Sequence, residues 1–429
     1  MRAARGWASF SGAARLLMVN QFGINLGFYM LMPFLADHLS HGLGLAGALV
    51  GMVLGARNLS QQGMFLLGGT LADRLGPKPL IAAGCLLRTV GFALLGLVDA
   101  LPALIAGAAA TGLAGALFNP AVRSYLAAES GARRVEAFAA FNVFYQAGIL
   151  AGPVVGLALT TVGFRLTCLV AAAVFAVLTV AQLAVLPHRP PAPADRRPLR
   201  DTWRHVLGDR AFLGFSTAMC GAYLLSFQTY LALPLALRAA DPTGSRSAVA
   251  VTGMFAAGGL LTVLGQRRLT AWCTGRWGPG RSLVRGTALL SAAFGLPALT
   301  GALLPGPAGA SLAAFVLAAL PLLATGLLIA LATMITFPFE MDTIVALSRG
   351  RLVATHYGLY NTIAGLGITL GNLVAGTALD VSRTRGVPAL PWLVLAATGA
   401  AATVALHRLQ RSGRLTPPAP RRPVEAKAG

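Results

Sequence analysis

Long apolar stretches alternate with short polar turns along almost the whole chain. Several stretches exceed the ~18 to 20 residues that a helix needs to cross about 30 Å of hydrocarbon. Bounded by Gly, Pro and charged residues, they predict twelve transmembrane helices in an all-α integral membrane protein. The predicted spans are residues 14–36, 45–69, 79–98, 102–127, 138–161, 165–186, 211–237, 247–266, 282–304, 311–338, 355–379 and 388–408.

Composition and charge agree with this pattern. Of the 429 residues, 56% are hydrophobic and 11% are charged, and the mean hydropathy is +0.71, whereas soluble domains are about 25% charged. The net charge of +21 could suggest nucleic acid. However, 26 of the 34 Lys and Arg residues fall on one side of the predicted spans and 5 in loops on the other, and cytoplasmic loops carry the positive excess. We therefore expect a multi-pass cell-membrane protein with both termini in the cytoplasm and no nucleic-acid partner.

A basic, Pro-rich stretch divides the predicted spans into two sets of six. We expect an N-terminal bundle (1–186), a cytoplasmic linker (187–210), a C-terminal bundle (211–408) and a disordered cytoplasmic tail (409–429). The halves share residues in the same order. The matched pairs are Tyr29 and Tyr230, Pro33 and Pro234, Arg74 and Arg276, Gly76 and Gly278, Pro77 and Pro279, Asn142 and Asn361, Gly148 and Gly367, and Gly152 and Gly371. A parallel duplication with a site between its halves is a transporter architecture.

The segment GGTLADRLGPKP, residues 68–79, places three charges in one turn between apolar runs. It resembles the loop 2–3 signature G-x-L-A-D-R-x-G-x-K of the major facilitator superfamily, although Pro77 stands where the family usually has a basic residue. The resemblance covers nearly the whole chain and implies two pseudo-symmetric six-helix bundles with an inner gate. Asp73 would meet the positive end of a helix in the other half, and the cations would meet Glu129. The implied gate residues are Gly69, Asp73, Arg74, Gly76, Lys78 and Glu129.

The resemblance implies that this turn stabilises the outward-open state, because its contacts would form in only one of two conformations. The alternative is a short solvated turn that only enforces topology.

A second motif, GILAGPVVG in the fifth predicted span, resembles the antiporter motif of exporters in that superfamily. Its residues are Gly148, Gly152, Pro153 and Gly156. Glycines four apart let another helix approach closely, and Pro removes a backbone hydrogen bond. Generic helix packing is the alternative. The N-terminal half is also similar to twelve-span drug:proton antiporters of the MdtH type.

Arg57 lies near the middle of the second predicted span, roughly 17 Å along it, where a charge is costly and needs a reason. We expect it to face a central cavity, with a structural hydrogen-bond cluster as the alternative; Arg88 is interpreted as structural. The predicted cavity residues are Asn20, Asn25, Tyr29, Arg57, Gln61, Tyr223, Phe227, Gln228 and Tyr230. A cavity with Arg57 and no nearby carboxylate favours neutral or weakly acidic lipophilic substrates over organic dications.

Carboxylates for proton coupling are scarce, because the chain has 13 Asp and Glu residues in total. Related antiporters commonly carry a carboxylate in the first span, where this chain offers Asn20. The remaining candidates, Glu340 and Asp342, follow Pro338 much as Arg123 follows Pro120. Our hypothesis is that one of them exchanges protons while Arg123 alternately pairs with it. A salt-bridge latch at the inner gate is the alternative.

These features favour a secondary transporter that exports a hydrophobic drug or natural product by proton antiport, acting as a monomer in the lipid bilayer. The alternative is a proton-coupled or facilitative importer of a small nutrient or lipid-like solute. A membrane-embedded enzyme or a transporter-like sensor is a third interpretation. The sequence has no HExxH, no Walker loop and no clustered His, so we expect no catalytic residue, no cofactor and no metal site.

Overall fold

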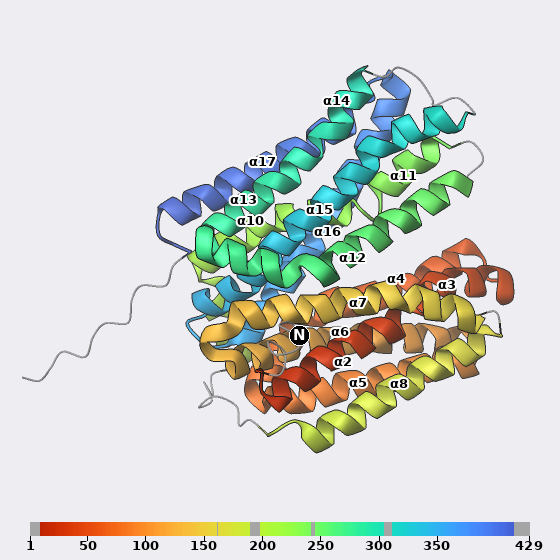
Figure 1. Ribbon diagram of the computed structural model, residues 1–429. Helices are drawn as coiled ribbons and strands as arrows, with labels where there is room; N and C mark the ends of the chain where they lie inside the picture. The colour runs from red at the N-terminus through yellow and green to blue at the C-terminus, as the bar shows by residue number, and fades with distance from the viewer. Residues whose placement is uncertain (1–8, 161, 189–197, 242–244, 304–310, 416–429) are drawn as a thin grey trace, which may run out of the picture.

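The computed structural model describes residues 9–160, 162–188, 198–241, 245–303 and 311–415. Most of the expected disordered tail and part of the linker lie outside these residues. Each regular element within the described ranges is a helix, as the apolar pattern predicts. The helices form two bundles, one before the linker and one after it (Figure 1).

The helix bounds are as follows. The first bundle contains α2 (Gly12–Tyr29), α3 (Met32–Asp37), α4 (Gly47–Leu75), α5 (Pro77–Leu97), α6 (Leu101–Ser130), α7 (Arg134–Thr160) and α8 (Phe164–Val185). The linker contains α9 (Leu199–Leu207). The second bundle contains α10 (Arg210–Phe227), α11 (Ala232–Ala239), α12 (Ser245–Arg276), α13 (Pro279–Ala293), α14 (Gly295–Leu303), α15 (Leu312–Leu347), α16 (Val353–Arg385) and α17 (Leu390–Arg411).

Nine stretches of the described helices are long and apolar enough to cross a membrane, so the count of twelve spans stays a prediction. The first span of each bundle is interrupted, a feature that the apolar windows did not predict. α3 and α11 begin close to Pro33 and Pro234. Proline provides no N–H and clashes with the carbonyl four residues earlier, here at Tyr29 and Tyr230. The repeated Tyr and Pro therefore mark the same break in both bundles.

Several helices extend beyond the predicted spans. α6, α12 and α15 end at Ser130, Arg276 and Leu347, past the apolar windows that predicted them. An apolar window marks only the part of a helix that lies within hydrocarbon, whereas the polar turns that follow can still form intrahelical hydrogen bonds. The extension of α15 carries Asp342, which pairs with Arg134 of the first bundle.

Two antiparallel helix pairs join the bundles, α4 with α16 and α7 with α12. A Cβ atom added to Gly358 of α16 would meet the Phe65 carbonyl of α4, and one added to Gly259 of α12 would lie 3.6 Å from the Cβ of Leu150 on α7. The hydrogen bonds between the bundles lie toward one end of these pairs. We call it the contact end and define it by Asp73, the C-terminal turn of α4 and the N-terminal turns of α7 and α16.

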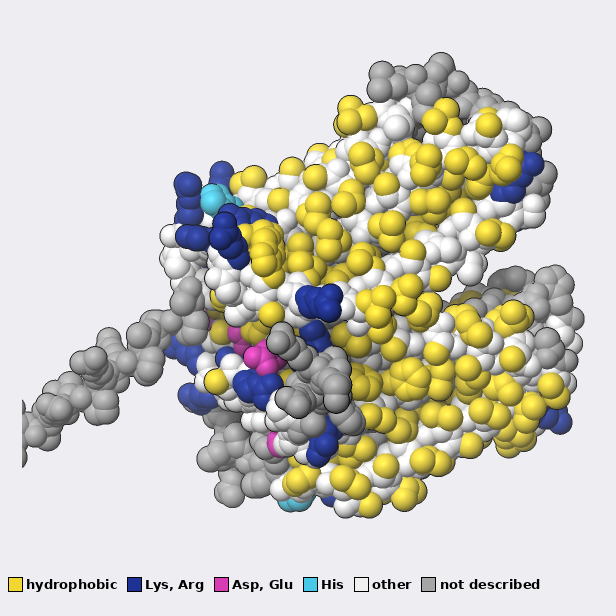
Figure 2. Space-filling model, viewed as in Figure 1, with side chains coloured by type: hydrophobic (Ala, Val, Ile, Leu, Met, Phe, Trp, Pro, Cys, Tyr) yellow, Lys and Arg dark blue, Asp and Glu magenta, His cyan; other side chains and the backbone are white. Residues whose placement is uncertain are grey.

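The bundles separate at the opposite end, which we call the open end. Gly51 of α4, Gly253 of α12 and Gly376 of α16 lie there, and a Cβ atom added to any of them would meet nothing within 4 Å. Figure 2 shows the molecular surface hollowed between the bundles at this end. The structure therefore represents a conformation that is closed at one end only.

Candidate functional site

The Asp73 carboxylate caps a helix of the opposite bundle. Its Oδ1 accepts a hydrogen bond from the backbone N–H of Ala354 at 3.1 Å. Its Oδ2 accepts from the N–H of Thr355 at 2.7 Å and from the Thr355 hydroxyl at 2.6 Å. α16 has no side-chain cap of its own, because the residue before it is Leu352, whose side chain has no hydrogen-bond acceptor. Asp73 therefore acts as an N-cap from the other bundle and faces the positive end of the helix dipole.

Glycine on α4 permits this contact, because it has no side chain to hold the backbones of α4 and α16 apart. A Cβ atom added to Gly69 would collide with the Ala354 carbonyl. Gly63, on the same helix, would place a Cβ atom in open space. Gly69 is thus required by the approach of α16, whereas Gly63 is not.

We expect Gly69→Ala to reduce transport at least tenfold, because overpacking of this kind costs about 1 to 3 kcal/mol and would separate α4 from α16. Gly63→Ala is the matched control, and it should keep full transport, since Ala favours a helix more than Gly does. Solute flux in proteoliposomes that contain equal amounts of each variant measures the difference. Equal activity of the two variants would contradict the role assigned to Gly69.

The remaining gate residues surround the turn between α4 and α5. Gly76 adopts φ 86°, a left-handed conformation that favours glycine. Arg74 donates to the Thr202 hydroxyl at 3.4 Å, and Lys78 donates to the Leu183 carbonyl at 2.9 Å. Glu129 is half-buried near the end of α6, and its pairing with these cations stays a prediction.

The linker helix α9 packs against the C-terminal end of α4, next to the turn between α4 and α5. The Trp203 indole N–H donates to the Thr70 hydroxyl at 3.0 Å, and Thr202 and Val206 are buried. The sequence predicts a basic linker here, and the structure adds an amphipathic helix that covers the end of α4.

Two further contacts cross between the bundles at the contact end. Arg134, the first residue of α7, forms an ion pair with Asp342 of α15 at 2.6 Å. Arg123 of α6 donates to the side-chain oxygen of Asn361 on α16 at 3.0 Å. In each bundle, a charged side chain that follows a helix proline therefore contacts the other bundle: Arg123 on α6 and Asp342 on α15.

A buried amide network joins α7 to α12. Asn142 donates to the side-chain oxygen of Gln266 at 2.9 Å. Gln266 in turn donates to the Met334 carbonyl at 2.8 Å and to the Thr270 hydroxyl at 3.0 Å. Because both amides are buried, separating the bundles would break the Asn142–Gln266 hydrogen bond and leave both groups unpaired unless water replaced it.

Glu340 and Asp342 lie two residues apart but have different surroundings. Asp342 has an arginine partner at the edge of the junction, whereas Glu340 is 3% exposed. The Tyr360 hydroxyl donates to Glu340 at 2.7 Å, and Tyr223 also hydrogen-bonds to it. Arg123 lies close enough for electrostatic attraction to Glu340, although its guanidinium donates to an amide. Glu340 is therefore held by neutral donors, with a cation of the other bundle nearby.

The four residues of the antiporter motif lie on α7, and its glycines lie against α2. A Cβ atom on Gly148 would lie 2.7 Å from the Cβ of Asn25, and one on Gly152 would lie 2.6 Å from the Cβ of Tyr29. One on Gly156 would collide with the Met30 carbonyl. This face lets α7 approach the interrupted first span closely.

Arg57 and Gln61 form a polar cluster on α4. The Arg57 guanidinium donates to the side-chain oxygens of Asn58 at 2.8 Å and Gln61 at 3.1 Å. It lies 4.5 Å from the centre of the Phe28 ring on α2. These three partners are all neutral, and Arg57 is half-buried. Arg88 is buried in the first bundle beside aromatic rings.

Three of the predicted cavity residues are packed between helices and do not reach an open surface. Asn25 donates to the Tyr145 carbonyl at 3.0 Å. Gln228 is completely buried and donates to the Leu224 carbonyl at 3.0 Å. Asn20 is also completely buried, and neither side-chain atom has a partner among the described residues. Their participation in substrate binding stays a prediction.

The aromatic members lie nearer to the gap between the bundles. Tyr230 is 51% exposed, and its ring centre lies 5.5 Å from that of Phe227. Its hydroxyl interacts with that of Tyr29 in the first bundle. The ring of Tyr223 lies edge-on to Tyr360, with centres 5.9 Å apart. The structure therefore groups these rings beside the junction, with Arg57 on α4.

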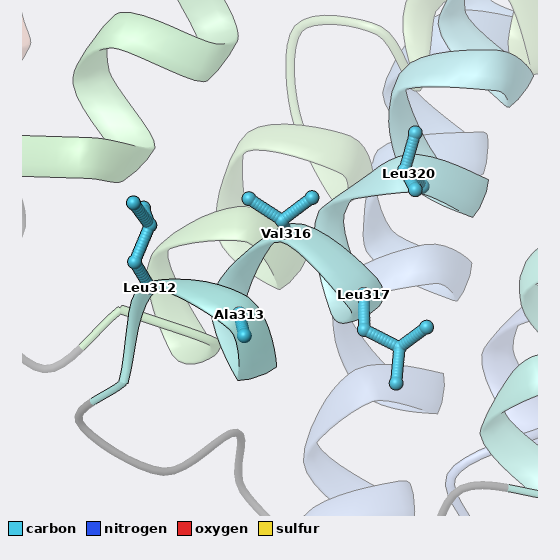
Figure 3. A pocket seen from close by; sticks show the side chains of 5 residues that line it. All are labelled: Leu312, Ala313, Val316, Leu317 and Leu320. Carbon is cyan, nitrogen blue, oxygen red and sulfur yellow. The ribbon is translucent and has the colours of Figure 1, made fainter.

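A shallow apolar pocket lies elsewhere, at the beginning of α15 (Figure 3). It is lined by Leu312, Ala313, Val316, Leu317 and Leu320. All five belong to one helix and none is polar, so this pocket offers no group that could orient a solute. It is separate from the junction residues.

Sequence reasoning did not select several residues of the junction as site residues. Thr355, Tyr360 and Gln266 were missed, although each has a direct polar contact with a partner described above. The paired Asn142 and Asn361 were noticed only as part of the internal repeat. The sequence signal that could have identified Asn142 and Asn361 was that a polar residue recurs at the same position in both halves.

Comparisons with known proteins identify the family of the chain. The family model described as "Major Facilitator Superfamily" matches residues 17–371. The chain is 52% identical over 401 residues to an uncharacterised MFS-type transporter of Mycobacterium tuberculosis strain H37Rv, covering 93% of this chain and 94% of the relative. It is 29% identical over 405 residues to the multidrug resistance protein MdtH of Yersinia enterocolitica, covering 91% and 92% respectively. The chain therefore belongs to the major facilitator superfamily.

Proposed function

We propose that this transporter exports lipophilic small molecules from the cytoplasm by proton antiport and alternating access, acting as a monomer. The observation that carries the proposal is the one-ended junction, in which the Asp73 helix cap and the Arg134–Asp342 ion pair join the bundles at the contact end, whereas Gly51 and Gly376 have free space at the open end. The relatives named multidrug resistance protein support a drug-like substrate. In this proposal the contact end and both termini face the cytoplasm, so the structure corresponds to an outward-open state.

Asp73 and the Arg134–Asp342 ion pair would stabilise that state. Both contacts connect residues of different bundles, so rocking the bundles to open the contact end would break them. A contact that exists in one state only shifts the equilibrium by its own free energy. The antiporter-motif face of α7 would allow α2 to move with it as one unit.

Glu340 is the proposed proton carrier, and Asp342 is the proposed latch. When ionised, Glu340 would attract Arg123 and hold the bundles together at the contact end. Protonation would remove this attraction and favour opening toward the cytoplasm, where water could accept the proton. This assignment fits the surroundings of Glu340, which combine neutral donors with one cation from the opposite bundle.

Arg57 would select substrates by charge. We expect Arg57→Gln to reduce transport of a lipophilic weak acid such as a fluorescein derivative about tenfold, since a charged hydrogen bond contributes roughly 1.5 to 3 kcal/mol. Transport of a neutral lipophilic dye should change little. Arg57→Lys keeps the charge and is the matched control. Equal losses for both substrates would argue for a structural cluster instead.

The direction of transport is tested with membrane vesicles of opposite orientation. Everted vesicles that pump protons inward should accumulate the substrate, and nigericin should abolish the accumulation by removing the pH gradient. The importer alternative predicts accumulation in right-side-out vesicles instead. A reporter fused after residue 75 should lie in the cytoplasm if the proposed orientation is correct.

A further inference from the structure

Arginine side chains gather at the contact end of the C-terminal bundle, around the turn between α12 and α13 and at the end of α17. Figure 2 shows Lys and Arg side chains concentrated at this part of the surface. Each member of the group is exposed. The group, which we call the arginine corner, consists of Arg267, Arg268, Arg276, Arg281, Arg285, Arg408, Arg411 and Arg414.

Two segments distant in sequence contribute to one surface. A Cβ atom on Gly280 would lie 3.2 Å from the Cγ of Gln410, so the beginning of α13 packs against the end of α17. The chain has no Asp or Glu between residues 242 and 339 or between 381 and 424. Among the described residues, Arg276, Arg281 and Arg285 form no ion pair with a carboxylate. The two segments that form the corner therefore contribute eight arginines and no carboxylate.

Aromatic rings mark the depth of this surface in the bilayer. The guanidinium of Arg285 lies 4.5 Å from the centre of the Trp277 ring. Trp272 is 51% exposed, and its ring centre lies 4.6 Å from that of Trp277. Tryptophan is enriched at the boundary between hydrocarbon and water. The corner is thus expected at the level of the lipid headgroups.

The matching turn of the N-terminal bundle has different partners. There Asp73 caps α16, Arg74 contacts the linker helix and Lys78 contacts a carbonyl of α8. In the C-terminal copy, Gly275 replaces the aspartate, while Arg276 and further arginines remain. By sequence, both the linker stretch 189–197 and the tail 416–429 are net positive.

We propose that the arginine corner binds the phosphate headgroup of an anionic phospholipid in the cytoplasmic leaflet. Guanidinium groups recognise phosphate through paired hydrogen bonds, and basic residues beside a membrane attract anionic lipids. The charge of the corner, its lack of carboxylates and its tryptophans all match this ligand. The proposal does not depend on which solute is transported.

The test is native mass spectrometry of the full chain in detergent, titrated with dioleoyl phosphatidylglycerol or dioleoyl phosphatidylcholine. Phosphatidylglycerol should bind more tightly. The triple variant Arg276→Gln, Arg281→Gln, Arg285→Gln should lose affinity for it on the order of 100-fold, since each cation contributes about fivefold. The control variant Arg165→Gln, Arg238→Gln, Arg385→Gln removes the same charge at the open end and should change binding less than threefold.

A second triple variant with Lys at residues 276, 281 and 285 keeps the net charge and should retain binding within tenfold. A loss equal to that of the Gln variant would overturn the proposal, because charge would then not explain it. Equal binding of the two lipids, or equal losses in the corner and control variants, would also overturn it. So would complete displacement of the lipid by millimolar inorganic phosphate, which would indicate a site for free anions.

Discussion

Asp73→Asn is expected to destabilise the closed contact end by about 3 kcal/mol, a roughly 100-fold change in the ratio of the two conformations. The substitution keeps the shape of the side chain but removes the negative charge that faces the N–H groups of Ala354 and Thr355. Charge-assisted hydrogen bonds and the helix dipole account for the loss. The measurement is the labelling rate of an introduced cysteine, Thr362→Cys, by a membrane-impermeant maleimide from the cytoplasmic side, in a chain without its natural cysteines.

Two control variants distinguish an effect on the closed contact end from a general loss of protein stability. Thr355→Val removes one hydroxyl donor but leaves both backbone donors, so it should change the ratio only about fivefold. Glu136→Gln disrupts an exposed ion pair with Arg133 within the first bundle, and it should have almost no effect because such pairs contribute little. If Asp73→Asn labelled at the native rate, the gate role of Asp73 would be refuted.

Glu340→Gln should abolish proton-driven transport, so that a pH gradient drives no more flux than it does in liposomes without the protein. Exchange of labelled for unlabelled solute without a gradient should persist, since the amide can still accept the Tyr360 hydrogen bond. Both fluxes are measured in the same proteoliposomes. The physical reason is that Gln imitates the protonated carboxyl and cannot release a proton.

Asp342→Asn tests whether Asp342 only holds the bundles together, as proposed, or also carries the proton. It should lower flux several-fold because the Arg134 ion pair is lost, yet flux should still depend on the pH gradient. A charge exchange, Arg134→Asp with Asp342→Arg, should restore part of the loss. If Asp342→Asn uncoupled transport while Glu340→Gln did not, the assigned roles would be reversed.

Much of the fold could be predicted from sequence because a bilayer imposes length and polarity on every span. The apolar windows indicate an all-helical protein in two halves, and the charge motif indicates the turn at Asp73. The breaks at Pro33 and Pro234 were not anticipated, although the repeated Tyr and Pro marked both positions. An apolar window carries no information on whether its backbone hydrogen bonds are continuous.

The site was less predictable, because its contacts depend on which helix faces which. Asp73 was expected to meet a helix end in the other half, but only coordinates identify α16 and Thr355. The different surroundings of Glu340 and Asp342 also depend on helix rotation, since two residues along a helix face different directions. Burial of Asn20 and Gln228 shows the same limit: a polar residue in an apolar span can face a cavity or pack between helices.

The two halves of the repeat join the bundles through different residues, and the sequence alone does not show which contacts replace one another. The C-terminal copy of the gate turn has Gly275 in place of Asp73. The matching helix start, at Arg134 of α7, instead reaches Asp342 of α15. The two junctions therefore use different chemistry, a helix cap in one and an ion pair in the other.

The most direct measurement is the distance between spin labels at the open end. α4 and α16 run antiparallel with Phe65 against Gly358, so Gly51 and Gly376 both lie toward that end, on opposite bundles. Labels attached through Gly51→Cys and Gly376→Cys have free space, since a Cβ atom meets nothing within 4 Å at either residue. The account predicts two distances whose populations exchange, with the shorter one favoured by Asp73→Asn and by substrate. A single distance that neither change alters would contradict alternating access.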